Sequence, residues 1–177
     1  MVNTGMTTPW TFPTLIEQYA EDESHIGWSD VDDFAALKSE INSGVPAVAP
    51  LLHIARSPKY DIKMKTWYLR CTGFDFINLP ETISGITLRL SMHRGGRVTD
   101  ETISLCYQNH DIGKNLADLP LNPTTIYGSS TDTWEIENLN LSMIQDSSFG
   151  VLLRFQSHPN WPHRTAPIVN GVELQIS

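Results

Sequence analysis

The chain has 177 residues, of which 40% are hydrophobic and 18% charged, and its net charge is −8. This composition can bury the core of one ordinary domain, which excludes wholesale disorder, and the acidic balance is unsuited to coating nucleic acid. No apolar run approaches the roughly 20 residues that span a bilayer, and two cysteines are too few for a disulfide scaffold or a Cys-based zinc site. We therefore expect a soluble protein made in the cytoplasm, with no cofactor, no metal, and no membrane or nucleic-acid partner.

The negative charge is concentrated near the N-terminus. Residues 1–50 hold eight acidic residues and one lysine, a local net of −7, whereas residues 51–177 hold twelve acidic and eleven basic residues. A basic stretch in this second part comprises Arg56, Lys59, Lys63, Lys65 and Arg70. One interpretation is a solvated edge strand whose charges block unwanted pairing. The alternative is that acidic and basic segments of neighbouring copies meet in an assembly, where complementary charge sets the register.

Residues 1–27 are predicted to form an N-terminal arm, and residues 1–13 within it are rich in Thr, Gly and Pro. Within the arm, the spacing of the apolar residues in Pro13–Glu21 predicts a short helix. A second helix is predicted just after the arm, over Ser29–Asn42, where Ser29 can cap the first turn. An arm with apolar anchors frays alone and is often held on another surface. We expect it to pack on a partner chain through Trp10, Phe12, Leu15, Ile16 and Tyr19.

The remainder of the chain, residues 28–177, is predicted as one β-domain. Its pattern of alternating apolar, β-branched and aromatic residues separated by turn signals predicts strands at Leu51–Arg56, Thr66–Thr72, Ile83–His93, Glu101–Gln108, Phe149–Gln156 and Ile168–Ile176. Many short strands without alternating helices favour an all-β fold, an antiparallel β-sandwich or jelly roll. The aromatic residues near the second strand are expected to fill its core: Trp67, Tyr68, Phe74 and Phe76.

A search for catalytic motifs finds no nucleophile elbow, zinc-protease helix, phosphate-binding loop or dinucleotide fingerprint, so we expect no enzymatic activity. The proline-containing loop between the last two predicted strands is a candidate recognition surface, because Trp161 can stack on a sugar ring or anchor a protein interface. We favour packing or an interface over sugar binding there. The candidate loop residues are His158, Asn160, Trp161 and His163.

An ordered set of segments resembles a β-sandwich module of tailed-bacteriophage structural proteins and their prophage relatives. The first segments are Thr72-Gly73-Phe74-Asp75-Phe76, preceded by Leu69, then Leu79-Pro80 and Ile83-Ser84-Gly85-Ile86. The later ones are Asp100-Glu101-Thr102-Ile103-Ser104-Leu105, Tyr127-Gly128-Ser129-Ser130-Thr131-Asp132-Thr133-Trp134 and Ser148-Phe149-Gly150-Val151, followed by an alternating strand from Val169 to Ile176. The matching residues are architectural: glycines for close backbone approach and aromatics for core volume.

The resemblance implies a non-enzymatic virion building block made in the host bacterial cytoplasm: a tail, baseplate, connector or capsid-decorating component. Its partners would be other virion proteins and further copies of itself in a symmetric assembly. The alternative is a carbohydrate-binding β-sandwich module for attachment to a host surface, with a glycan as the ligand, because jelly rolls often bind sugars. Fold alone does not decide between the two functions.

Overall fold

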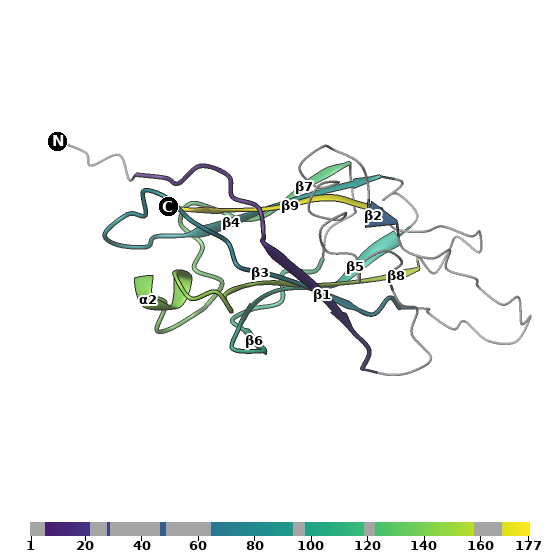
Figure 1. Cartoon of the computed structure of the whole chain (residues 1–177). Coiled ribbons are helices and arrows are strands. Elements are labelled where there is room, and N and C mark those ends of the chain that lie inside the picture. The colour runs from purple at the N-terminus through teal and green to yellow at the C-terminus, as the bar shows by residue number, and fades with distance from the viewer. Residues whose placement is uncertain are drawn as a thin grey trace, which may run out of the picture.

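The computed structural model describes residues 6–21, 28, 47–48, 65–93, 98–118, 123–157 and 168–177. Over these residues the fold is all-β, with antiparallel strands arranged in two sheets that lie one above the other (Figure 1). The α-helix described is the single turn α2, Leu141–Ile144, which Asn140 caps by accepting a hydrogen bond from the backbone N–H of Met143. No helix among the described residues has the length and apolar character to cross a membrane.

The strand order differs between the two sheets. The five-stranded sheet is ordered β1-β3-β8-β5-β6. Its strands are β1 (Leu15–Tyr19), β3 (Tyr68–Thr72), β5 (Val98–Tyr107), β6 (His110–Ile112) and β8 (Gly150–Ser157). The four-stranded sheet is ordered β2-β9-β4-β7. Its strands are β2 (Ala47–Val48), β4 (Ile86–His93), β7 (Thr124–Gly128) and β9 (Ile168–Ile176).

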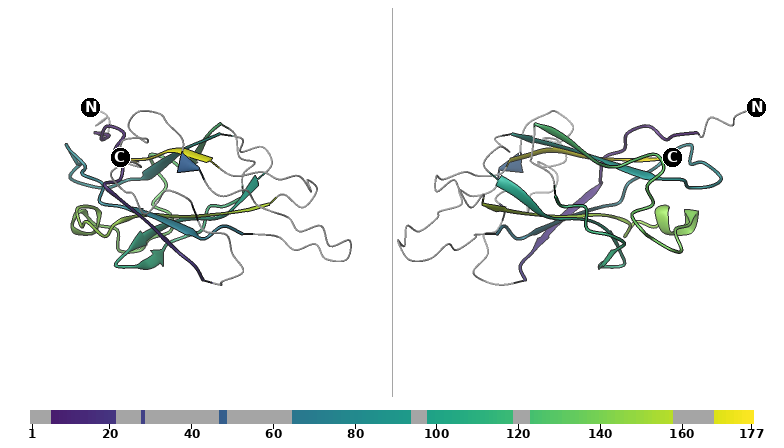
Figure 2. Two further views of the ribbon diagram at one scale, coloured as in Figure 1. Left: turned by 45° about the vertical axis from the view of Figure 1, so that its right-hand side comes forward. Right: turned by 180° about the vertical axis from the view of Figure 1, so that it is seen from behind.

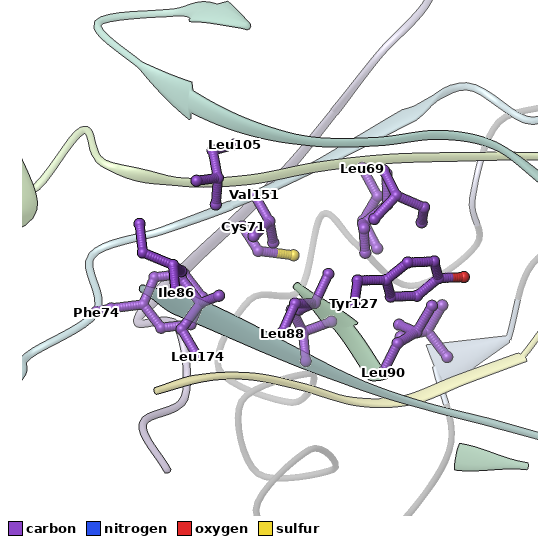
Figure 3. Close-up of a cluster of buried hydrophobic side chains, with 14 of the residues drawn as sticks. Leu69, Cys71, Phe74, Ile86, Leu88, Leu90, Leu105, Tyr127, Val151 and Leu174 are labelled. Atoms are coloured by element: carbon purple, nitrogen blue, oxygen red, sulfur yellow. The ribbon is translucent and has the colours of Figure 1, made fainter. Parts of the chain in front are cut away.

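One hydrophobic core lies between the sheets, because alternate side chains of each strand point inward. The four-stranded sheet contributes Leu88, Leu90 and Leu174, and the five-stranded sheet contributes Leu105 and Val151 from the other side (Figure 3). All of these side chains are fully buried. The core therefore depends on strands that are far apart in the sequence.

Most strands predicted from the sequence are confirmed. The predicted segments Thr66–Thr72, Ile83–His93, Glu101–Gln108, Phe149–Gln156 and Ile168–Ile176 coincide within a few residues with β3, β4, β5, β8 and β9. The predicted helix Ser29–Asn42 and the predicted strand Leu51–Arg56 lie outside the described residues.

The helix predicted over Pro13–Glu21 is wrong. This segment contains β1, which pairs antiparallel with β3 in register from Leu15–Thr72 to Tyr19–Tyr68. The apolar spacing fits a helix, but it also fits a strand with Ile16 facing inward and its neighbours outward. The segment forms a strand because it pairs with β3, and whether a short segment forms a strand depends on such tertiary contacts.

Residues 6–21 form a clasp across the two sheets. The clasp first runs beside β9, where Thr11 and Leu174 exchange backbone hydrogen bonds of 2.9 Å, and then continues as β1 on the edge of the other sheet. Figures 1 and 2 show this purple segment passing from the sheet that holds the C-terminus to the opposite sheet. Part of the predicted arm is therefore a strand of the fold.

The glycines and aromatics of the resembling segments have the architectural places expected of them. Trp134 is fully buried and its indole N–H donates to the carbonyl of Ile86 at 2.8 Å. Gly128 has a φ of +70°, and a Cβ there would meet the Trp134 ring. Phe74 is in the core and Phe76 packs against it.

Candidate functional site

The structure separates the five residues predicted to bind a partner. Ile16 is 4% exposed and belongs to the core of its own chain. Phe12 and Leu15 are 37% and 42% exposed, and their side chains are large and apolar. Trp10 and Tyr19 have intermediate exposure and contact charged or aromatic neighbours. Only part of the predicted set is thus available to a partner.

Backbone hydrogen bonds hold the first half of the clasp on β9. Besides the Thr11–Leu174 pair, the N–H of Thr8 donates to the carbonyl of Ile176 at 2.8 Å, and the Thr8 hydroxyl accepts from the N–H of Ile176 at 2.9 Å. These bonds use the edge of β9 that faces away from β4. The clasp is therefore a preformed surface of the folded chain, and its exposed residues are positioned in advance.

Trp10 covers an ion pair on the outer face of the four-stranded sheet. The guanidinium of Arg89 lies 4.3 Å from the centre of the Trp10 ring. It also donates from Nε to Glu173 at 2.6 Å, and this hydrogen bond raises the pKa of Arg89. Arg89 and Glu173 sit opposite each other on β4 and β9. Their charges cancel locally, so this face carries little net charge around Trp10.

The outer face of the five-stranded sheet carries a stack of arginine and tyrosine side chains. The rings of Tyr19 and Tyr68 are stacked with centroids 5.0 Å apart. Arg70 lies 5.2 Å from the Tyr19 ring, and Arg154 lies 4.1 Å from the Tyr68 ring. Because β3 lies between β1 and β8, Tyr68 has Tyr19 on one side and Arg154 on the other. Its ring faces are therefore occupied within the chain.

A charged network fixes this stack. Buried Arg154 donates to Glu101 at 2.9 Å and to Glu21 at 2.7 Å, and Lys65 donates to Glu101 at 2.7 Å. Burial alone would raise the pKa of Glu101, but the hydrogen bonds from Arg154, Lys65 and Thr102 outweigh it and lower the pKa to about 2. Glu101 therefore remains ionised at neutral pH, and the arginine and lysine charges are balanced in place.

Sequence analysis missed this network and assigned Tyr68 to the core, which is wrong. The missed signal is the alternation along β3: Leu69 and Cys71 are buried in the core, so Tyr68 and Arg70 must point outward. An aromatic residue next to arginines on the outer side of a strand is typical of stacking rather than of core filling.

The buried polar and thiol groups are structural. Burial raises the pKa of Cys71 and raises that of Cys106 to about 12, so both thiols are protonated and unreactive at neutral pH. The Tyr127 hydroxyl donates to Asp100 at 2.9 Å inside the fold, and burial with the nearby Asp100 charge raises the pKa of Tyr127. Within the described part of the chain, no group of three or more His, Cys, Asp or Glu residues is placed to hold a metal ion.

The residues of the candidate recognition loop, His158, Asn160, Trp161 and His163, lie outside the described residues. Searches of family models, of curated proteins and of solved structures each found no match to this chain.

Proposed function

We propose that this chain is a non-enzymatic structural protein of a bacteriophage virion, a tail, baseplate, connector or capsid-decorating component that acts by protein–protein assembly. Its partners are other virion proteins and further copies of itself. The proposal starts from the ordered resemblance of residues 69–176 to phage structural modules. It is supported by the strand pairing and by the exposed apolar residues of the clasp.

We propose further that the two sheets form a jelly-roll sandwich. The support is a nested set of antiparallel pairs: β2 with β9, β3 with β8, β4 with β7, and β5 with β6. Such nesting arises when one long antiparallel ribbon is rolled up, so that its strands alternate between two sheets. Jelly rolls are a common architecture of viral capsid proteins and lectins.

The observation that carries the assembly function is the concentration of exposed apolar residues on the clasp. The large hydrophobic side chains exposed in the described chain are Met6, Phe12, Leu15, Ile77 and Ile126. Three of them lie within residues 6–21, on a segment held by backbone hydrogen bonds. Large apolar side chains exposed along one segment are typical of interaction sites, and a preformed segment loses little conformational entropy on binding.

Particle incorporation tests this function. Particles banded by density from lysates of producing cells are probed with an antibody against the chain, and we expect the chain in the particle band at a fixed ratio to the other virion proteins. The double variant Phe12→Ser with Leu15→Thr should fold and be lost from the particles, since both side chains are exposed.

The matched control is Ile77→Thr, which removes an apolar side chain that is 57% exposed and lies outside the clasp. We expect this variant to enter particles like the unmodified chain. Recovery of the unmodified chain only from the particle-free fraction would overturn the proposed function. Normal incorporation of the double variant would overturn the assignment of the clasp as the assembly surface.

A further inference from the structure

We propose that two copies of the chain pair through their β7 strands, antiparallel and centred on Ile126, so that their four-stranded sheets join into one continuous sheet. This inference deepens the proposed assembly function, because it identifies a second copy as a partner and β7 as the contact. It rests on the backbone of β7, the chemistry of its side chains and the charge of the chain.

Among the described residues, no strand pairs with the side of β7 that faces away from β4. β7 ends the four-stranded sheet and pairs with β4 alone among the described strands. The bond from the N–H of Met92 to the carbonyl of Pro123 sets the alternation of the β4–β7 ladder. Every second residue of β7 bonds to β4, so Thr125 and Tyr127 exchange hydrogen bonds with β4. The N–H and C=O groups of Thr124 and Ile126 point away from β4.

The same alternation follows from the other side of β4. Leu174 exchanges both of its backbone hydrogen bonds with Thr11 of the clasp, so its N–H and C=O point away from β4. Leu174 and Leu88 are therefore a non-hydrogen-bonded pair in the β4–β9 ladder. Leu88 must then exchange bonds with its β7 partner, Tyr127. Two independent sets of hydrogen bonds therefore indicate that the backbone N–H and C=O of Ile126 point away from β4.

The side chains of β7 lack the features that usually prevent edge pairing. Its sequence, Thr-Thr-Ile-Tyr-Gly, has no charged residue and no proline, and Ile126 is 46% exposed. Natural edge strands are commonly protected by charge, proline or a bulge. The neighbouring Arg89, opposite Ile126 on β4, is paired with Glu173 and adds no net charge to this edge.

A second copy fits this edge because the pairing is self-complementary. In an antiparallel arrangement centred on Ile126, each Ile126 exchanges two hydrogen bonds with its equivalent, and the two isoleucine side chains form a cross-strand apolar pair. A two-fold axis through this pair makes the contact closed, which gives a dimer rather than a fibre. The uncharged strand also lets two molecules of net charge −8 approach without placing like charges in contact.

Sedimentation velocity on the purified full-length chain tests the inference. We expect a concentration-dependent monomer–dimer equilibrium for the unmodified chain. Ile126→Lys places two ammonium groups opposite each other, and Ile126→Pro removes the outward N–H without removing a bond to β4. We expect each variant to weaken dimerisation by at least about tenfold, which is the loss of roughly 1.4 kcal/mol.

Ile77→Lys is the matched control, because it makes the same exchange at an exposed isoleucine away from β7, and we expect its dimerisation to be unchanged. Near-UV circular dichroism checks that each variant is folded. If Ile126→Pro does not fold, hydrogen exchange in the unmodified chain supplies the second measurement: the Ile126 amide should exchange more slowly as the protein concentration rises. Any of three results would overturn the inference. The unmodified chain could stay monomeric at millimolar concentration, the Ile126→Lys variant could dimerise as tightly as the unmodified chain, or the exchange rate of the Ile126 amide could be independent of protein concentration.

The failure of this inference and of the proposed function are distinguishable. If the chain bands with particles but stays monomeric in solution, the β7 contact is wrong and the virion function stands. If the chain dimerises through Ile126 but is never found in particles, the β7 contact stands and the virion function is wrong.

Discussion

Two glycines in paired strands of this fold have opposite surroundings. A Cβ at Gly150 would overlap the carbonyl oxygen of Cys71, where β8 passes close to β3, whereas a Cβ at Gly171 would lie 3.7 Å from the Cβ of Ser91, an ordinary contact. The first glycine is therefore required by close backbone approach. The second is replaceable.

We expect Gly150→Ala to lower the free energy of unfolding by about 2 kcal/mol or more, because the backbone of two paired strands must separate to admit the methyl group. Gly171→Ala should be neutral or stabilising by about 0.5 kcal/mol, since alanine has less conformational freedom to lose. Urea denaturation of both variants measures the difference. Equal stabilities would show that β3 and β8 are not held as closely as described.

The sequence predicts the role of Gly150 but not the network around Arg154. A glycine between Phe149 and Val151 in an otherwise apolar strand indicates close backbone approach by itself. By contrast, Arg154, Glu101 and Glu21 are brought together from β8, β5 and the clasp. No local pattern predicts which distant acids meet a given arginine, because that depends on strand order.

At the level of elements, β1 decides whether the N-terminal segment is an appendage or part of the domain. Ile16 lies in the core and is bordered on the same strand by Leu15, which is exposed. The predicted division into an arm over 1–27 and a domain over 28–177 implies that neither residue matters for the stability of the fold. The packing of Ile16 leads us to expect otherwise.

We expect Ile16→Ala to lower the free energy of unfolding by about 2–4 kcal/mol, because it leaves a cavity in the shared core. Leu15→Ala, on the neighbouring exposed position, should change it by less than about 0.5 kcal/mol. Chemical denaturation followed by tryptophan fluorescence compares the two. If Ile16→Ala proves as stable as Leu15→Ala, residues 1–27 are an arm after all.

The elements that sequence analysis found and missed differ in length and in pairing. The long alternating strands β4, β5, β8 and β9 carry a period of two over eight to ten residues, which local pattern alone reveals. β6 has three residues, which is too short for periodicity to stand out, and β7 has five, of which only Ile126 and Tyr127 are apolar or aromatic. β1 was assigned to the wrong class because five residues fit both periods and only β3 distinguishes them.

At the scale of the whole molecule, the fold brings sequence-distant strands together in nested pairs, and two of its exposed surfaces are the outer side of β7 and the clasp. These two surfaces differ in chemistry: β7 is an uncharged strand at the end of the four-stranded sheet, whereas the clasp is a preformed segment that crosses both sheets and exposes apolar side chains. A protein with two unlike contact surfaces can bind a copy of itself through one and another component through the other. That combination suits a repetitive assembly built from more than one kind of subunit.

Charge determines how such self-association should respond to salt. Each copy carries a net charge of −8, and the proposed β7 contact is uncharged, so the electrostatic term between copies is repulsive. Raising ionic strength from about 10 mM to about 150 mM shortens the screening length from roughly 30 Å to roughly 8 Å. We therefore expect the dimer to become several-fold tighter as sodium chloride is added, measured by sedimentation velocity at fixed pH.

The opposite salt effect would contradict the neutral contact. If salt weakens the dimer, opposite charges meet across the contact, and the acidic N-terminal third would pair with the basic stretch from Arg56 to Arg70 of the second copy. The direction of the salt effect thus separates a neutral edge-to-edge contact from a charge-matched one without any substitution in the chain.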